Sequence, residues 1–364
     1  MAVRVAALVP WMQRRASQLD EVAGFPVDEI AALGEAGALA MELPIDRVGA
    51  EKSENRGVLA DQLASVLVQI GLGNLAVGRI VEAHINARHL ICRYGSPEQR
   101  SASATDVRDR HLYALWVTDP PAGGLRMAVT SEGIRLMGHK VFCSAAGFAT
   151  RALVTAVNED GGSQMLVVDL GNGERVEQLE SPLQGMRAAV TGAVDFTGCM
   201  VAEDQCLGDV GDYLREPDFS AGAWRGSAVA LGGLSSLIEL TKAQLKAAGR
   251  LDNPHQLQRM GTAMIACETG RLWLRQVAQA AEDPDVAPAR AIAYVGLARI
   301  AIETACLDAM QLVQRSLGLS AFRRGNPVER ICRDLGTYLR QPAPDEVLSQ
   351  AAAYYSRQTM PGVP

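Results

Sequence analysis

Two hydroxyl side chains bracket the most informative stretch of this 364-residue chain, residues 112–144. Thr118 ends one apolar run and Ser144 ends another, within sequence whose alternating apolar and polar residues are typical of β-strands. From strand ends, polar side chains can reach a flat ligand while the core stays apolar. If the two strands are neighbours, both hydroxyls face one place. The sequence therefore predicts a ligand site there.

The periodicity of apolar residues divides the chain into three parts. Residues 3 to about 110 repeat every three or four positions, as helices do, and Ser96, Pro97 and Gln99 form the capping box of one helix. Residues 112 to about 211 alternate with period two between Gly, Asn and Asp turns. Short strands at that spacing predict a small antiparallel barrel or sandwich, with hairpins at 158–162 and 171–173.

The helical period returns after residue 218 in three long segments, at roughly 224–248, 254–282 and 287–317, and a last helix follows Pro344. Long helices with few breakers are typical of a bundle. The predicted fold class is therefore α+β and multidomain: an α-helical domain at 1–111, a β-barrel domain at 112–217 and a helical bundle at 218–364.

Composition excludes several functional classes. The net charge of −6 and the pI near 5.5 give no basic footprint for nucleic acid. Charges or glycines break every apolar run before the roughly 20 residues of a membrane span. The seven cysteines show no CxxC or paired histidine spacing, so we expect no metal site, reduced thiols and a cytoplasmic protein.

Motifs along almost the whole chain resemble the acyl-CoA dehydrogenase superfamily. VTDPPAG at 117–123 is similar to the family's V-T-E-P-G-A-G, and GHKVFCS at 138–144 to its G-x-K-x-W-I-[ST]. Further matches lie at Phe25-Pro26, Gly37 through Pro44 to Gly49, 94–99, 185–187, Gly249 with His255-Gln256, and 326–334. Each motif alone is weak, but their shared order and spacing identify the chain as a member.

The resemblance implies a fold of helical domain, β-barrel and four-helix bundle, with FAD held between barrel and bundle. It implies that Thr118 and Ser144 bond the isoalloxazine, that Phe142 lies beside it, and that Gly123, Gly124 and Gly318 belong to the cofactor site. Hydrogen bonds to the ring edge would tune its potential. The alternative is that Thr118 and Ser144 only satisfy strand ends.

The catalytic base of the family is missing. Acyl-CoA oxidation needs a base for the α-proton, and counting from Arg333-Asp334 puts Pro342 at the position of the usual glutamate. Four acids are weak candidates to replace it. Asp345 and Glu346 follow Pro344 in a helix's first turn, where carboxylates oppose the helix dipole, and Glu216 and Asp218 precede the first long helix.

The expected phosphate contacts also depart from the pattern. Gly124 replaces a serine, Leu245 replaces an arginine that reaches across the subunit interface, and Leu319 and Ala321 replace glycines after Gly318. Three arginines are possible substitutes, with solvated surface residues as the alternative: Arg250, Arg323 and Arg324.

Other polar residues receive weaker interpretations. Arg187 and Arg225 are candidates for an anionic substrate group such as a CoA phosphate, whereas Arg333-Asp334 is expected to form a structural ion pair. His84 and His89 on a helix, and His139 in a predicted turn, lack metal-type spacing and are not interpreted as ligands.

Three functions follow. The leading hypothesis is an FAD-dependent oxidoreductase that dehydrogenates an acyl-CoA or acyl-carrier substrate with an unassigned base, as a homodimer or homotetramer, passing electrons to an electron-transfer flavoprotein. A flavin monooxygenase of the same fold needs no α-proton base. A homologue that has lost flavin and serves as a binding or assembly subunit would suit the altered phosphate site.

Overall fold

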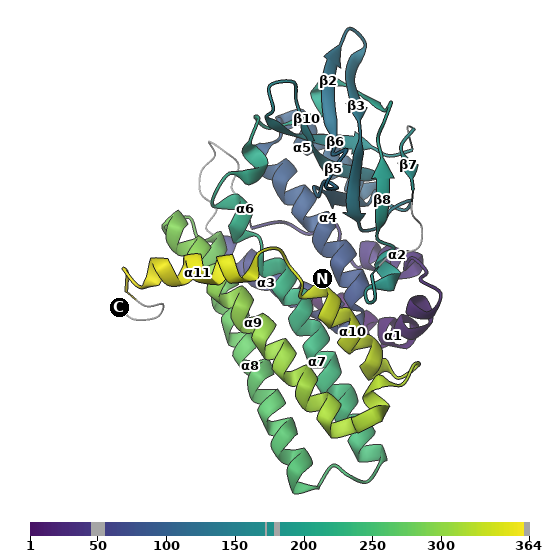
Figure 1. The fold of residues 1–364 in the computed structure, drawn as a ribbon, viewed down its shortest axis with the longest axis vertical. Coiled ribbons are helices and arrows are strands. Elements are labelled where there is room, and N and C mark those ends of the chain that lie inside the picture. Colours follow the sequence, from purple (N-terminus) through teal and green to yellow (C-terminus); the bar gives the residue numbers. More distant parts are fainter. Residues whose placement is uncertain (45–54, 172, 178–182, 360–364) are drawn as a thin grey trace.

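A computed structural model describes residues 1–44, 55–171, 173–177 and 183–359 of the chain. Helices come first, then strands, then helices again (Figure 1). The strands form one end of the elongated molecule and the long helices form the other, with α4 running between them. This arrangement confirms the predicted fold class. As domain limits, 1–111, 112–217 and 218–364 stay a prediction.

The first part contains five helices: α1 (Ala2–Glu21), α2 (Val27–Glu35), α3 (Arg56–Gly73), α4 (Leu75–Tyr94) and α5 (Pro97–Arg108). The predicted capping box of α5 is present, because Ser96 Oγ accepts from the Gln99 N–H and Gln99 Oε1 accepts from the Ser96 N–H. The Gln99 amide also donates to the carbonyls of Asp204 and Cys206, at 2.7 Å each. The cap therefore also ties α5 to the strands. The motif at 37–49 ends outside the described residues.

The strands form two packed sheets. They are β1 (Tyr113–Trp116), β2 (Arg126–Thr130), β3 (Gly133–Met137), β4 (His139–Cys143), β5 (Arg151–Val157), β6 (Ser163–Asp169), β7 (Arg175–Val176), β8 (Gly192–Asp195), β9 (Met200–Val201) and β10 (Cys206–Leu207). One sheet has the order β10-β6-β5-β2-β3-β9, and β4-β8-β7 is the other. The prediction of a purely antiparallel arrangement is wrong, because β1 and β2 both pair with β5 in parallel.

Of the two predicted hairpins, one is present. The turn at 158–162 joins β5 to β6, with the Asn158 N–H donating to the Gly162 carbonyl at 2.8 Å. The turn at 171–173 leads from β6 to β7 in the other sheet, so it is not a hairpin; Asn172 itself lies outside the described residues. Glycine and asparagine mark a turn, but they do not tell which strands it joins.

The last part contains α6 (Asp218–Ala221), α7 (Trp224–Ala247), α8 (Pro254–Glu282), α9 (Pro288–Leu317), α10 (Pro327–Tyr338) and α11 (Pro344–Tyr355). The predicted long helices agree with α7, α8 and α9 to within a residue at each end. The helix α10 was not predicted separately, although Asn326 caps it by accepting from the Val328 N–H. No helix among the described residues is long and apolar enough to cross a membrane.

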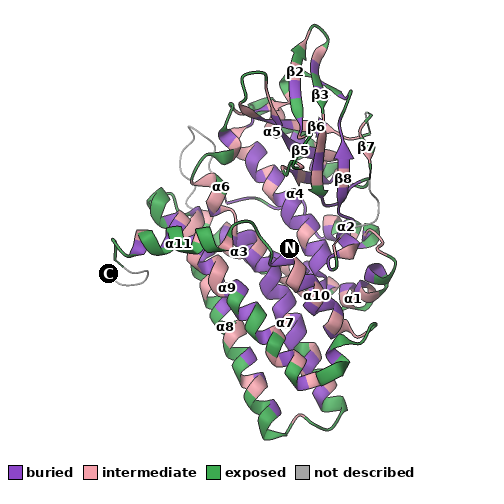
Figure 2. Ribbon diagram, viewed as in Figure 1, coloured by how far each residue is buried: buried purple, intermediate pink, exposed green. Residues whose placement is uncertain are grey.

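The helix α3 packs tightly on α7, because glycines face each other where the helices cross. A Cβ on Gly232 of α7 would overlap the Val68 carbonyl oxygen, and one on Gly71 of α3 would overlap that of Val229. This backbone contact joins the N-terminal helices to the long ones. Buried residues fill the region between α3, α4 and α7 (Figure 2).

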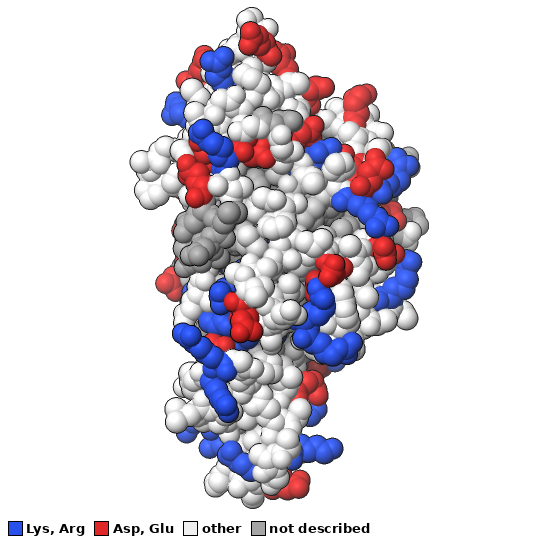
Figure 3. All heavy atoms as spheres, turned by 90° about the vertical axis from the view of Figure 1, so that its right-hand side faces the viewer, with Lys and Arg blue, Asp and Glu red and all other residues white. Residues whose placement is uncertain are grey.

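Charged side chains of both signs are interspersed on the face shown in Figure 3. That face carries no extended basic surface of the kind that binds a phosphate backbone.

The helix crossing predicts the effect of one methyl group. Gly232→Ala should lower the free energy of unfolding by about 2 kcal/mol or more, because backbone atoms cannot make room for the new Cβ. Gly261→Ala in α8 is the matched control, since no atom lies within 4 Å of its Cβ position, and it should be neutral or stabilise by up to about 1 kcal/mol. Urea denaturation measures both. Equal effects would contradict the described packing.

Candidate functional site

The ends of β1 and β4 are neighbours, which is the condition on which the predicted ligand site depends. The Val141 N–H donates to the Thr118 carbonyl at 3.0 Å, and the Trp116 indole N–H donates to the Ser144 carbonyl at 2.9 Å. The two hydroxyl residues therefore lie on adjacent segments. Their environments differ, because Thr118 is exposed whereas Ser144 is 7% exposed and its Oγ lies 3.5 Å from Thr191 Oγ1.

Between them, Phe142 is held in an uncommon conformation. Its φ is +54°, where bulky side chains are rare, and the register of β4 against β8 shifts between Lys140 and Cys143. Such a bulge re-aims side chains and recurs beside active sites. The Phe142 ring is 55% exposed as a result. An exposed aromatic side chain thus lies between the two hydroxyl residues along the chain.

An ion pair between the buried Lys140 and the exposed Asp119 supports this edge. Lys140 is fully buried, and its Nζ donates to Asp119 Oδ1 at 2.7 Å and to Thr155 Oγ1 at 3.1 Å. Burial lowers the pKa of Lys140, and the Asp119 carboxylate opposes that shift. Asp119 Oδ1 also accepts from the Leu125 N–H at 3.0 Å. The pair therefore fixes the loop that carries Thr118.

The same pair explains a departure from the family pattern. A Cβ on Gly124 would lie 2.9 Å from Asp119 Cγ, so a serine there would collide with the carboxylate. Gly123, at φ +78°, is exposed in the same loop. The missing serine at 124 is thus a consequence of where Asp119 lies.

The predicted phosphate region looks different from the ring region. Leu245 is fully buried in the hydrophobic core, so it replaces the family's arginine by a packing residue. Gly318 ends α9 at φ +61°, and the next residue, Leu319, is 90% exposed, while Ala321 is buried. Of the three substitute arginines, Arg250 donates to the Ser316 carbonyl at 3.3 Å, and Arg323 and Arg324 are exposed.

Two of the four candidate bases, Asp218 and Glu216, accept hydrogen bonds from neighbouring side chains. Asp218 Oδ2 accepts from Arg93 Nε at 3.0 Å and from the Tyr94 hydroxyl at 2.7 Å. Glu216 accepts from the N–H and hydroxyl of Ser220 in α6.

The other two acids have the structural position expected for them. Asp345 and Glu346 lie in the first turn of α11 and are exposed. Pro342 is exposed between α10 and α11, and its carbonyl accepts from Arg299 Nη2 at 2.7 Å. The structure brings none of these acids into hydrogen-bond contact with Thr118 or Ser144.

The two arginines proposed for the substrate differ in burial. Arg187 begins a short 3-10 turn, η1 (Arg187–Ala189), and its Nη2 lies 3.4 Å from the Glu21 carbonyl. Arg225 of α7 is 3% exposed and donates to Glu282 Oε1 at 2.9 Å and to Asn86 Oδ1 at 3.1 Å. A role in substrate binding stays a prediction for both.

The Arg333-Asp334 motif of α10 is structural, but its two residues do not pair with each other. Arg333 bonds Asp20 at 2.7 Å and Glu329 at 2.8 Å, and Asp334 pairs with Arg330 at 3.1 Å. The direct pair that the sequence suggested is therefore wrong.

The motif at 185–187 docks on this helix. The Gly185 N–H donates to Thr337 Oγ1 at 3.1 Å, and the Met186 N–H donates to Asp334 Oδ1 at 2.6 Å. Further along, the Ala145 N–H donates to the Ala189 carbonyl at 2.8 Å. The segment thus connects α10 to the residue after Ser144.

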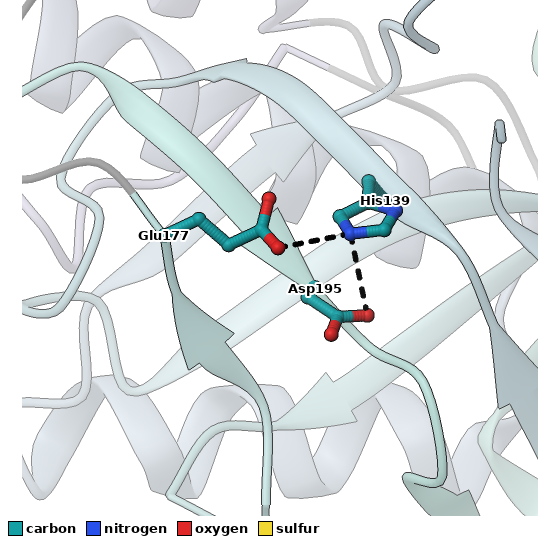
Figure 4. Close-up of side chains that lie close together, drawn as sticks. All are labelled: His139, Glu177 and Asp195. Atoms are coloured by element: carbon teal, nitrogen blue, oxygen red, sulfur yellow. Dashed lines mark hydrogen bonds and ion pairs between the residues drawn. The ribbon is translucent and has the colours of Figure 1, made fainter. Parts of the chain in front are cut away.

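The histidines fall into two groups. His84 and His89 are buried on α4, and burial lowers the pKa of His84 to about 3. His139 is the first residue of β4, so its prediction as a turn residue is wrong. Its Nε2 lies 3.0 Å from Glu177 Oε1 and 3.7 Å from Asp195 Oδ1 (Figure 4). Arg175 already pairs with Asp195, and we interpret this cluster as a link between β4, β7 and β8.

Sequence reasoning missed a row of buried and half-buried polar residues on α4. They recur at intervals of three and four and so occupy one helix face: Arg79, Glu82, Asn86, His89 and Arg93. The spacing was visible in the sequence, but polar residues at helical spacing are usually a solvated face. Only the packing of α7 and α10 over α4 shows that Glu82 and His89 are buried and that the other three residues are half-buried.

No known protein-family profile matches the chain. It is 27% identical over 345 residues to 3-sulfinopropanoyl-CoA desulfinase of Variovorax paradoxus, covering 88% of this chain and 84% of the relative. It is 26% identical over 340 residues to cyclohex-1-ene-1-carbonyl-CoA dehydrogenase of Geobacter metallireducens, covering 88% and 87%. A similar solved structure is FMN-bound TdsC, a dibenzothiophene monooxygenase from Paenibacillus sp. A11-2, with TM-score 0.86 and 18% identity over 99% of this chain and 98% of that one.

The fold of the chain is that of solved structures such as FMN-bound TdsC. Its sequence relatives are acyl-CoA dehydrogenase family members, and the chain has the fold of that superfamily.

The ion pair predicts that removing Asp119 lowers the free energy of unfolding more than removing Lys140 does. Asp119→Ala should destabilise the protein by at least about 2 kcal/mol more than Lys140→Met, because the first leaves an ammonium buried without its carboxylate. Asp160→Ala, in the exposed β5–β6 turn, is the matched control and should change stability by less than about 0.5 kcal/mol. Urea denaturation at pH 7 measures all three. Lys140→Met as the more damaging change would refute the assigned role.

Proposed function

We propose that the protein is a flavin-dependent oxidoreductase that acts on an acyl thioester. The observation that carries the proposal is Phe142, strained and exposed between Thr118 and Ser144 at neighbouring strand ends. The similarity to acyl-CoA dehydrogenases supports a flavin as the ligand of these residues. The two sequence relatives described above are named for CoA thioesters, which supports the substrate class.

The residues at the ring edge fit a flavin. The hydroxyls of Thr118 and Ser144 would bond the polar edge of the ring, and Phe142 would cover one side of it. A bound flavin supplies a two-electron acceptor for the substrate. Ser144 Oγ has only a 3.5 Å contact in the protein, so it is free to bond a ligand.

We propose FAD as the form of the flavin, with its adenosine half held weakly. Gly123, Gly124 and Gly318 would line its path, while Leu245 and Leu319 offer no polar contact to its phosphates. Arg323 and Arg324 are exposed and near Gly318 in sequence. They are the arginines that we assign to the phosphates.

The assembly is proposed as a homodimer or homotetramer formed through the bundle. Four apolar side chains of α8 recur at helical spacing and are at least 43% exposed: Leu257, Met264, Ile265 and Leu272. Apolar surface of this kind marks an interaction site. An electron-transfer flavoprotein as the electron acceptor and a cytoplasmic location complete the proposal.

A monooxygenase is the second candidate, and the missing base favours it. Pro342 has no proton-accepting side chain, and Asp218 and Glu216 are held by Arg93, Tyr94 and Ser220. Oxygen activation by reduced flavin does not require removal of an α-proton. The residues at the ring edge would have the same roles in both reactions.

Spectroscopy of the purified protein separates these functions. A protein that takes up flavin and is bleached by acyl-CoAs without oxygen would support dehydrogenation. Flavin that acyl-CoAs do not bleach, but that consumes oxygen rapidly when reduced in the presence of an acyl thioester, would favour the monooxygenase. A colourless protein that does not take up added FAD or FMN would refute both and leave the binding or assembly subunit.

Ser144→Ala tests the ring edge. Loss of one hydrogen bond should cost about 1 kcal/mol, seen as flavin binding several times weaker or a potential shifted by about 20 mV. Ser131→Ala, in the exposed turn between β2 and β3, is the matched control and should change neither quantity. Flavin titration and potentiometry provide the measurements. An unchanged affinity and potential in Ser144→Ala would remove Ser144 from the site.

A further inference from the structure

A second buried hydroxyl lies beside the one proposed for the flavin ring. The register of β4 against β8 pairs Cys143 with Gly192, so the residues next to them, Ser144 and Thr191, are opposite each other. Their hydroxyl oxygens are 3.5 Å apart, and either of them can be the donor. Ser144 is 7% exposed and Thr191 is 4% exposed. Thr191 therefore adds a polar group that the sequence motifs did not indicate.

The backbone next to this pair is hydrogen-bonded across the two segments and strained. The Ala145 N–H donates to the Ala189 carbonyl at 2.8 Å, and the Ala146 N–H donates to the Val190 carbonyl at 3.2 Å. The φ angles of Ala145 and Val190 are +61° and +45°, and a positive φ is a genuine outlier for a β-branched residue. Such conformations persist where the surrounding structure imposes them, and they recur at ligand sites. The backbone thus holds the two hydroxyl residues in one relative position.

The two hydroxyls have too few hydrogen-bond partners for their burial. An O–H···O bond is ordinarily about 2.7–2.8 Å long, so the contact at 3.5 Å is weak. Neither hydroxyl has another partner in the part of the chain that the structure describes. If one hydroxyl donates to the other, the proton of the second still lacks an acceptor. In a buried place, a ligand or an ordered water usually supplies the missing acceptor.

Two hydroxyls at this separation match two neighbouring acceptors on one ligand. A flavin has such acceptors at one edge of its ring, the N5 nitrogen and the C4 carbonyl oxygen. Hydrogen bonds from Ser144 to one and from Thr191 to the other would satisfy both protons. A ligand with a single acceptor would leave one donor without a normal hydrogen bond. The number of unused donors therefore equals the number of acceptors at that edge.

We propose that Thr191 is a second residue that binds the flavin ring, and that Ser144 and Thr191 together stabilise the reduced ring. The inference rests on the proposed function and adds a residue that sets the flavin potential.

The contact between the two hydroxyls matters when the flavin is reduced. N5 of the oxidised ring accepts a hydrogen bond, whereas two-electron reduction makes it an N–H donor. Ser144 Oγ can then accept from N5 if its own proton finds another acceptor. Thr191 Oγ1 is that acceptor, and the Thr191 proton still bonds the carbonyl oxygen. Rotation of the two hydroxyls is sufficient, so no covalent bond in the protein changes.

The test compares Thr191→Val with the unaltered full-length chain and uses FMN, which isolates the ring from the adenosine half of FAD. Valine keeps the branched shape and removes the hydroxyl. We expect FMN to bind about fivefold more weakly, the effect of one lost hydrogen bond. The ratio of reduced to oxidised bound flavin should also fall about fivefold at a fixed potential, which lowers the midpoint potential by about 20 mV. Flavin titration and potentiometry measure the two quantities.

Further variants separate the hydroxyl from the packing of the site. Thr191→Ala also lacks the hydroxyl and should shift both quantities in the same direction. Thr191→Ser keeps the hydroxyl, so its FMN affinity and potential should stay close to those of the unaltered chain. Thr241→Val is the matched control, because Thr241 is fully buried on α7 and donates to the Leu237 carbonyl at 2.7 Å. It should lower the melting temperature without moving the potential.

The double variant tests the coupling between the two hydroxyls. In a chain that already carries Ser144→Ala, Thr191→Val should shift the potential less than it does alone, because residues of one hydrogen-bond network are not additive. Equal shifts in both backgrounds would contradict the proposed coupling.

Several outcomes would overturn this inference alone. One is an unchanged FMN affinity and potential in Thr191→Val together with altered values in Ser144→Ala. Others are a higher potential in Thr191→Val, an equal shift in Thr241→Val, or a Thr191→Ser variant that behaves like Thr191→Val. A chain that takes up neither FMN nor FAD would overturn the proposed flavin function and this role of Thr191 with it. The two failures are therefore distinguishable.

Discussion

The candidate site depends on one buried lysine. Lys140 places an ammonium group inside the strands, and Asp119 at the end of β1 is the carboxylate that stabilises it. A buried charge tolerates little displacement of its partner. The loop that carries Thr118 is therefore fixed against β4, and the aromatic residue of the β4 bulge lies next to it. Glycine at 124 follows, because Asp119 occupies the space of a larger side chain.

The two ends of the proposed cofactor site have diverged to different extents. At the end proposed for the ring, Thr118 and Ser144 lie on adjacent segments, and Phe142 lies between them along the chain. At the phosphate end, a core leucine at 245 and an exposed leucine at 319 stand where the family has polar contacts or glycine. This pattern is expected if selection kept the contacts to the flavin ring and no longer kept those to the FAD phosphates.

The sequence predicted the elements well, because long apolar periods and helix caps are local features. The bounds of α7, α8 and α9 and the capping box at Ser96 needed no tertiary information. Parallel pairing of β1 with β5 could not be predicted, since strand order depends on contacts between distant residues. The burial of Glu82 on α4 was missed for the same reason, because this residue looks like part of a solvated surface until α7 and α10 pack nearby.

The same limit applies to the candidate site. Thr118 and Ser144 were recognised from motifs, yet the engagement of Asp218 by Arg93 and Tyr94 depends on side-chain packing. Arg225 illustrates both the use and the limit of the motifs. The sequence identified it as a candidate for substrate binding, but only the structure shows that it already pairs with Glu282. Motifs thus locate chemical groups, and packing decides which of them are available.

We propose that the protein binds the flavin ring well and the adenosine half of FAD weakly. Equilibrium dissociation constants of FAD and FMN for the purified apoprotein test this proposal. We expect FMN to bind within about tenfold of FAD, a difference of no more than about 1.4 kcal/mol. FAD binding a thousandfold or more tighter than FMN would contradict it, because Arg323 and Arg324 or other residues would then hold the adenosine half of FAD strongly.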